Sequence, residues 1–290
     1  MLFLHLWSTL RINTKALLLV TTKLIQESPI GVFDSGLGGL TVLKSLEKIL
    51  PKEFFVYFGD TAHVPYGNKS ADAISCYSRN IVDFFLELNA KAVVIACNTA
   101  SAVAFQELRK SYNIPLFDVV EPSVVHSNYI SKTRKIGVIG THSTVHSKAY
   151  TRSLLALNSD CSVVEIACPL FVPLIEEGWS DTPVAHEVAH SYLQTFQDTG
   201  MDTLILGCTH YPIMAQTIQG VVNKHVQLVY SGETVGKNLS AFLETNNCKN
   251  NSGTPGETQF YVTDYPQKFD ELGSRFLGRK LEHVKHLLLT

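Results

Sequence analysis

Two short apolar runs, each ending on a cysteine, constrain the fold of this chain more than any other feature. The first is AVVIAC at 92–97 and the second is TLILGC at 203–208. Continuous apolar runs of this length are typical of strands buried on both faces, as in parallel α/β sheets. Ligands of such sheets bind beyond the carboxyl ends of the strands. We therefore expect Cys97 and Cys208 to lie at a ligand site.

Strand and helix patterns alternate along the chain from residue 29 onward. The expected strands are 29–33, 54–58, 92–97, 116–120, 135–140, 162–167, 203–208 and 260–262. Helical patterns are expected at 40–50, 74–88, 100–112, 183–199, 233–243 and 269–276, with a loop or short helix at 171–178. Further helices are expected after 141–144 and after the second cysteine run. The alternation predicts an α/β fold of parallel sheets with helices on both faces.

The spacing of the polar strand ends indicates two pseudo-symmetric, doubly wound domains. Asp34 and Cys97 are 63 positions apart, and Thr141 and Cys208 are 67 apart. We expect the segment after residue 230 to fold back on the first half. The predicted domains are therefore 29–121 with 231–290, and 122–230.

The first 28 residues fall outside this pattern. Arg11 and Lys15 divide two apolar runs that are each too short to span a bilayer. A secretory signal needs one unbroken apolar stretch after its positive charges. We expect residues 1–28 to be a poorly ordered extension, or to follow from a start codon upstream of the true one. A membrane-targeting role is the minor alternative.

The composition excludes several classes of partner. The formal net charge of the 290 residues is −2, without a block of like charge, so we expect no nucleic-acid and no membrane partner. The six cysteines are scattered and form no CxxC pair, which fits a reducing, cytoplasmic location. Cys208 and His210 are two positions apart with no second close pair, so we expect no metal site.

A cysteine between a strand and a helix has particular chemistry. A thiolate there meets free backbone N–H groups and the positive end of the helix dipole, which can lower the thiol pKa. The alternative is a small packed cysteine, which we expect for Cys76, Cys161 and Cys168. Because Cys97 and Cys208 occupy matched positions, we favour the functional interpretation for both.

The glycine-rich turn at 34–39 does not fit a dinucleotide site. The third glycine of the G-x-G-x-x-G spacing falls at Thr41, and Asp34 would repel a phosphate. A carboxylate at this turn suits a cationic group or a proton relay. The alternative is that Asp34 caps the helix that begins near Leu40.

Three further candidates each have an ordinary alternative. His210 can shuttle protons near neutral pH, although the chain has 11 histidines and most must lie on the surface. The bend at 65–67 offers Tyr66 and Gly67, or is an ordinary turn. Glu176 and Glu177 are acid/base helpers or a solvated helix end.

Five motifs together resemble glutamate racemase, within the aspartate/glutamate racemase superfamily. They are VFDSGLGGL at 32–40, GDT at 59–61 with PYG at 65–67, ACNTA at 96–100, FVPL at 171–174 and LGCTHYP at 206–212. The resemblance runs from about residue 29 to 278. It implies two α/β domains with the active site in the cleft between them, and no pyridoxal phosphate or other cofactor.

The resemblance also implies roles for individual residues. Cys97 and Cys208 would be the two acid/base residues, assisted by Asp34, by His210 and by Glu176, which we choose over Glu177. The residues implied to contact the substrate are Asp34, Ser35, Tyr66, Gly67, Asn98, Thr99, Thr209 and His210.

The resulting hypothesis is a cofactor-independent, two-base racemisation of L-glutamate to D-glutamate for cell-wall peptidoglycan. One alternative is a racemase for aspartate or another small amino acid. A second is an amino-acid-binding or redox module in which Cys97 and Cys208 form a disulfide. The sequence leaves open whether the protein is a homodimer and which thiol serves which enantiomer.

Overall fold

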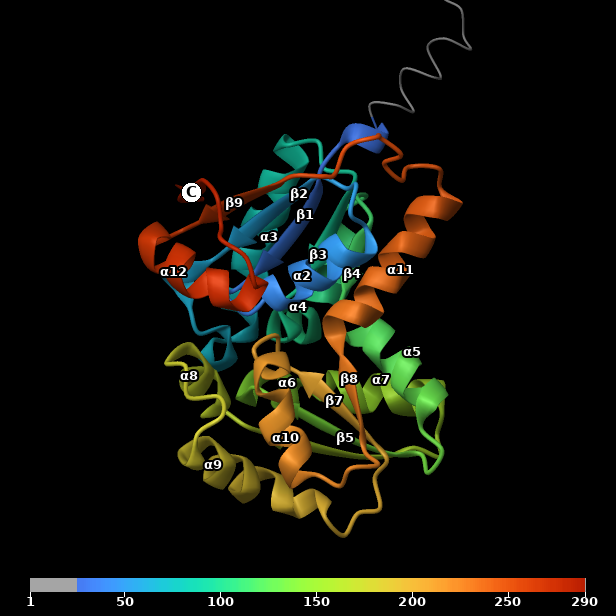
Figure 1. The fold of residues 1–290 in the computed structure, drawn as a ribbon. Helices are drawn as coiled ribbons and strands as arrows, with labels where there is room; N and C mark the ends of the chain where they lie inside the picture. The colour runs from blue at the N-terminus through green and yellow to red at the C-terminus, as the bar shows by residue number, and fades with distance from the viewer. Residues whose placement is uncertain (1–24, 290) are drawn as a thin grey trace, which may run out of the picture.

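The computed structural model describes residues 25–289. The extension expected at 1–28 lies almost entirely outside the described residues. Figure 1 shows two α/β halves, one above the other, each built around its own sheet. We call the half that holds the first sheet the first layer, and the half that holds the second sheet the second layer.

All strand pairs in the two sheets are parallel, as the alternation of strands and helices predicts. The first sheet has the order β10-β9-β2-β1-β3-β4, and the second has the order β6-β5-β7-β8. The strands of the first sheet are β1 (Ile30–Asp34), β2 (Phe55–Gly59), β3 (Ala92–Ile95), β4 (Leu116–Asp118), β9 (Thr258–Val262) and β10 (Val284–His286). The strands of the second sheet are β5 (Lys135–Gly140), β6 (Ser162–Ala167), β7 (Thr203–Gly207) and β8 (Gln227–Tyr230).

Helices cover the faces of both sheets (Figure 1). The helices between the strands of the first sheet are α2 (Leu40–Ile49), α3 (Ala71–Glu87) and α4 (Asn98–Ser111), and α5 (Val120–Ile130) follows β4, where the chain passes to the second sheet. Those of the second sheet are α6 (His142–Ser147), α7 (Ala149–Leu157), α8 (Phe171–Glu176), α9 (Pro183–Leu193) and α10 (Ala215–Val221), and the C-terminal ones are α11 (Ser231–Thr245) and α12 (Pro266–Leu277). Single 3-10 turns are η1 (Thr61–His63), η2 (Tyr66–Asn68), η3 (Gln194–Phe196) and η4 (Tyr211–Met214).

The cysteine strands are as deeply buried as their sequences predict. Every residue of β1, β3 and β7 is buried. In β1, Val32 packs into the core under α2 and α11, while Phe33 packs into the core under α3 and α4. A strand covered by helices on both faces of its sheet has no polar face, so its sequence is an unbroken apolar run.

The predicted strand at 116–120 ends two residues early because a side chain starts the next helix. The Asp118 carboxylate accepts the backbone N–H groups of Val120 and Glu121 at 2.8 and 3.0 Å. These bonds satisfy two of the free N–H groups at the start of α5. The helix predicted at 183–199 likewise ends at Leu193 and continues as η3.

Three helices and strands have no counterpart in the sequence predictions, namely α5, β8 and β10. Strand β10 has three residues, two of them exposed, and thus no hydrophobic period. It exists because it pairs with β9, which pairs with β2. The chain crosses between the sheets at β4–α5 and again at β8–α11 (Figure 1).

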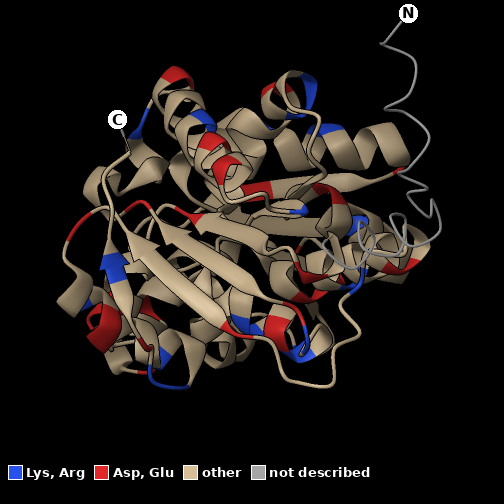
Figure 2. Cartoon of the chain, turned by 90° about the horizontal axis from the view of Figure 1, so that it is seen from above, with Lys and Arg blue, Asp and Glu red and all other residues tan. Residues whose placement is uncertain are grey.

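Acidic and basic residues are mixed along the chain. Figure 2 shows the two kinds interspersed over the described residues, and the formal net charge of the full sequence is −2. Among residues 25–289, no helix is both long enough and apolar enough to cross a membrane.

Candidate active site

A cavity of about 340 Å³ lies between the carboxyl ends of the two sheets, and both Cys97 and Cys208 line it. Cys97 follows β3, the neighbour of β1, and Cys208 follows β7, the neighbour of β5. The two cysteine strands therefore deliver their thiols to one space from opposite layers. The other candidate residues that line it are Ser35, Tyr66, Gly67, Asn98, Thr99, Glu176, Thr209 and His210.

Cys97 is the N-cap residue of α4. Its Sγ accepts the backbone N–H of Ala100 at 3.5 Å and lies 3.9 Å from the Ser35 hydroxyl. Burial, followed by the charge of Asp34, raises the pKa of the Cys97 thiol to about 12, against the lowering effect of the Ala100 and Ser35 donors. The loss of hydration thus outweighs the lowering of this pKa that the helix start can give.

Cys208 has the same exposure as Cys97 but different neighbours. The exposed fractions are 6% and 5%. The backbone N–H of His210 donates to the Cys208 thiol, whose Sγ lies 4.0 Å from His210 Nδ1. Burial raises the pKa of Cys208, and a charge on Cys97 raises it further. The site therefore favours at most one thiolate at a time.

Asp34 lies behind the cavity and does not line it. The side chain is fully buried, and its carboxylate accepts the Gly36 N–H at 2.9 Å and the Thr209 hydroxyl at 3.4 Å. Burial raises the pKa of Asp34, opposed by the nearby His210 and by the N–H groups of Gly36 and Gly39. Asp34 thus joins the turn before α2 to the turn after β7, which includes part of the capping role considered above.

His210 and Glu176 form a pair at the cavity wall. His210 Nε2 lies 3.1 Å from Glu176 Oε1, and this hydrogen bond lowers the pKa of Glu176. His210 therefore contacts Cys208 through one ring nitrogen and Glu176 through the other. Glu177 is the exposed C-cap of α8 and does not line the cavity. Of the two glutamates, the structure brings only Glu176 to the candidate site.

Asn98 and Thr99 sit in the first turn of α4, where β3 ends. Asn98 Nδ2 donates to the Tyr150 hydroxyl at 2.8 Å and to Ser231 Oγ at 3.0 Å, while its buried Oδ1 has no partner among the described residues. Thr99 Oγ1 lies 2.9 Å from Thr141 Oγ1. An unpaired buried amide oxygen is a ready acceptor for a ligand N–H group.

Tyr66 and Gly67 lie on the loop from β2 to α3. Tyr66 lines the cavity, but its hydroxyl donates to Asp60 at 2.6 Å and is thus already engaged. Gly67 packs so close to Thr141 that an added Cβ would lie 2.9 Å from the threonine Cβ. The loop therefore needs glycine here to meet the second layer of the molecule.

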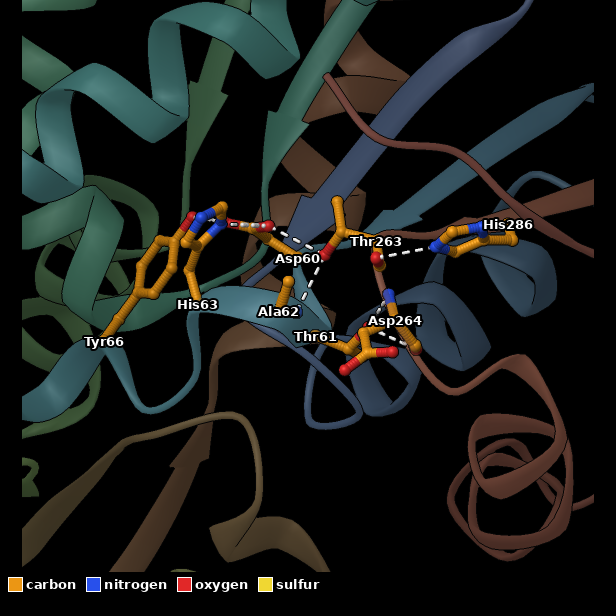
Figure 3. Close-up of polar contacts among 8 residues, drawn as sticks. All are labelled: Asp60, Thr61, Ala62, His63, Tyr66, Thr263, Asp264 and His286. Atoms are coloured by element: carbon orange, nitrogen blue, oxygen red, sulfur yellow. Dashed lines mark hydrogen bonds and ion pairs between the residues drawn. The ribbon is translucent and has the colours of Figure 1, made fainter. Parts of the chain in front are cut away.

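A buried carboxylate holds this loop to the C-terminal part of the chain (Figure 3). Asp60 accepts from Tyr66 at 2.6 Å, from His63 Nδ1 at 2.8 Å and from Thr263 Oγ1 at 2.9 Å. The Thr263 main-chain oxygen in turn contacts His286 Nε2 of β10 at 3.0 Å. Strands β9 and β10 thus support the cavity loop from behind.

Several residues that line the cavity were not predicted from the sequence. Thr141 and His142 line it, as do Val64, Pro65, Pro169, Val172 and Pro173. Thr141 ends β5 in the way that Asp34 ends β1, and that repeat was the available signal. The apolar members carry no chemical signature in the sequence.

The described residues contain neither a cluster of metal-ligand side chains nor a disulfide bond. No group of three His, Cys, Asp or Glu side chains within residues 25–289 is arranged to hold a metal ion. All six cysteines lie within that range and are free thiols.

Known proteins match this chain over most of its length. The family model Asp/Glu/Hydantoin racemase matches residues 30–234. A glutamate racemase of Geobacter metallireducens is 43% identical over 260 residues, which cover 90% of this chain and 96% of the relative. The crystal structure of Francisella tularensis glutamate racemase with D-glutamate superposes with a TM-score of 0.86 at 38% identity, covering 91% of this chain and 98% of that one. Thermus thermophilus glutamate racemase with β-chloro-D-alanine gives 0.84 at 43% identity and the same two coverages.

Proposed function

The chain belongs to the Asp/Glu/hydantoin racemase family, and from that premise we propose that it interconverts L-glutamate and D-glutamate without a cofactor. The single observation that carries the proposal is the pair of matched thiols, Cys97 and Cys208, lining one cavity from opposite layers. The D-glutamate so formed serves cell-wall peptidoglycan synthesis, as in glutamate racemases generally.

Racemisation removes the Cα proton from one face of the substrate and returns a proton to the other face. One thiolate takes the proton, and the opposite thiol gives one. After turnover the two groups have exchanged protonation states, so the reverse direction uses the same pair with the roles swapped. The mutual repulsion of two thiolates at Cys97 and Cys208 favours this state of one base and one acid.

The buried environment strengthens the base. The Cα–H of an amino acid is a very weak acid, and an ordinary thiolate with a pKa of about 8.5 is poorly matched to it. Burial raises the pKa of both thiols, so each thiolate is more basic than a free cysteine. The ammonium group of a bound substrate adds a positive charge, which lowers the free energy needed to form the thiolate.

The substrate has three charged groups, and the cavity offers a partner for each. The unpaired Asn98 Oδ1 is suited to the ammonium group. The hydroxyls of Ser35, Thr99 and Thr209 and the N–H groups at the helix start are suited to carboxylates. The α-carboxylate gains enolate character during proton transfer, so fixed donors around it lower the barrier.

The remaining groups act on the thiols. We assign His210, held by Glu176, to proton exchange at Cys208, and buried Asp34 to the placement of the Thr209 and Gly36 turns. The same arrangement supports domains of 29–121 with 231–290, and of 122–230. A homodimer and a cytoplasmic location belong to this proposal as well; light scattering and cell fractionation test them.

The test is exchange at Cα. When L-glutamate is incubated with the protein in D2O, the glutamate is expected to lose its circular dichroism signal and its Cα proton signal together. A folded protein that changes neither signal contradicts the proposal. A panel containing aspartate and other small amino acids tests the alternative substrate, since a faster reaction with any of them would replace glutamate.

A further inference from the structure

Tyr57 on β2 is a buried tyrosine that the two-thiol mechanism leaves without a role. Its side chain is fully buried, and its hydroxyl donates to the main-chain oxygen of Gly36 at 2.8 Å. Its ring packs against Phe260 of β9 and Phe269 of α12, with ring centroids 6.2 and 6.0 Å away. The C-terminal elements thus hold the ring, while the hydroxyl reaches the turn beside Cys97.

That turn is fixed on both sides of Gly36. The Gly36 N–H donates to Asp34, and the Gly36 carbonyl accepts from Tyr57. Ser35 immediately precedes it. Its backbone N–H donates to the Cys97 sulfur, and its Oγ, 3.9 Å from that sulfur, accepts from the thiol and can donate to the thiolate. The Gly36 N–H belongs to the 35–36 peptide plane and the Gly36 carbonyl to the 36–37 plane, so these two bonds together fix the chain on the C-terminal side of the Ser35 Cα.

We propose that Tyr57 is a positioning residue for proton transfer at Cys97. Its hydroxyl holds the Gly36 carbonyl and so keeps the Ser35 donors directed at the sulfur. The inference rests on the proposed two-thiol racemase function, because only a reacting thiolate needs such donors. It assigns the C-terminal return a task in the site through the ring contacts of Tyr57.

The surroundings of Cys97 explain why these donors matter. The titratable groups that face its sulfur are Asp34 on β1, Tyr57 on β2, Tyr66 on η2 and Cys208 after β7. None of the four carries positive charge, so none stabilises a thiolate through its charge. The stabilising contacts are the N–H groups of Ala100 and Ser35 and the Ser35 hydroxyl.

The test measures the thiols directly. Wild type and Tyr57→Phe are treated with iodoacetamide at about pH 9, near the pKa of free thiols, and the alkylation rates of Cys97 and Cys208 are separated by peptide mass spectrometry. Because the two residues are almost equally exposed, Cys208 is an internal reference. We expect Cys97 to react roughly three- to tenfold more slowly relative to Cys208, as its thiolate fraction falls.

Tyr211→Phe is the matched control. Tyr211 is equally buried, and its hydroxyl donates to the Gly140 and Cys168 carbonyls at 3.0 and 2.9 Å, away from the Gly36 turn. It removes the same group and is expected to leave the Cys97 rate unchanged. In a Ser35→Ala background, which keeps only the backbone N–H of residue 35, Tyr57→Phe is expected to slow Cys97 by less than it does in wild type.

Two results overturn the inference. One is an unchanged ratio of the two rates in a Tyr57→Phe protein that unfolds cooperatively. The other is an equal change in Tyr211→Phe. If Tyr57→Phe does not fold, Phe269→Leu is used instead, because it keeps the Tyr57 hydroxyl and removes one supporting ring. Phe269→Leu must then also lower the alkylation rate of Cys97 relative to that of Cys208. A wild type that fails to racemise glutamate refutes the proposed function separately, because alkylation requires no turnover.

Discussion

Cys97 and Cys208 are matched in exposure and differ in their neighbours. Cys97 has the Ser35 and Ala100 donors, with the Asp34 charge nearby. Cys208 has His210 and, beyond it, Glu176. In the proposed mechanism, the two faces of the substrate would therefore meet bases with different support. This asymmetry suits the alternation between acid and base that the proposal assigns to the two thiols.

Replacing either thiol is expected to abolish turnover. A serine hydroxyl is a far weaker acid than a thiol, so Cys97→Ser and Cys208→Ser should each reduce kcat by at least about a thousandfold. The measurement is racemisation followed by circular dichroism, with thermal unfolding to confirm that each variant is folded. Substantial racemisation by either folded variant would rule out the two-thiol mechanism.

Glu176 and Glu177 provide a matched pair for testing the histidine contact. Glu176→Gln removes the charge that faces His210, and we expect kcat to fall roughly three- to tenfold. Glu177→Gln alters a neighbouring exposed residue away from the cavity and should stay within about twofold of wild type. Equal effects of the two substitutions would show that the contact has no catalytic weight.

At the scale of elements, the site depends on how strands end. Asp34, Cys97 and Cys208 lie where a buried strand stops and a turn or helix begins, and the crossing from β4 to α5 has the same form. There Asp118 caps α5 from a buried position, and burial raises the pKa of its carboxyl to about 7. A carboxyl with that pKa makes the crossing sensitive to pH.

The sign of that sensitivity follows from the two protonation states. The folded pKa of Asp118 lies above its ordinary value of 3.8. Its contribution to stability is therefore complete below about pH 4 and is lost as pH rises through about 7. The expected loss for wild type relative to Asp118→Asn is up to about 4 kcal/mol between these limits. Urea unfolding of both proteins across this range measures it, and parallel stability curves would contradict the assignment.

At the scale of the whole molecule, two glycines let the layers approach each other. A Cβ at Gly38 would collide with Thr209 Oγ1 and His210 Nδ1, and a Cβ at Gly67 would meet Thr141. Both contacts join segments of the first layer to segments of the second across the cavity. We therefore expect close approach at these two points to set the distance between the opposing thiols.

Gly38→Ala is therefore expected to hold the cavity open. We expect kcat/KM to fall by roughly a hundredfold, because a displacement of about 1 Å between reacting groups has effects of that size. Small-angle scattering should show a larger radius of gyration. Gly220→Ala is the control, since its added Cβ meets nothing within 4 Å and lies in α10. Unchanged kinetics in Gly38→Ala would show that the contact does not set the thiol spacing.

The sequence by itself determined the class of fold and the candidates for the reacting atoms. Buried parallel strands leave long apolar runs, so the cysteine strands could be placed without a structure. The two cysteines could be named from their residue type and matched positions, whereas Glu176 was named only through the family resemblance. The boundary at Asp118 and the small strand β10 could not be placed, since each depends on a partner distant in sequence or on a side-chain bond.

Only the tertiary structure decided how the candidate groups are surrounded. Asp34 lies behind the cavity, the Tyr66 hydroxyl donates to Asp60, and Glu176 rather than Glu177 reaches His210. Burial also raises the pKa of both thiols, although a helix start can lower it. Local sequence supplies the N–H groups and the helix start near each cysteine, whereas the loss of water around it results from packing the two layers together. That packing joins residues far apart in the chain, and no local pattern encodes it.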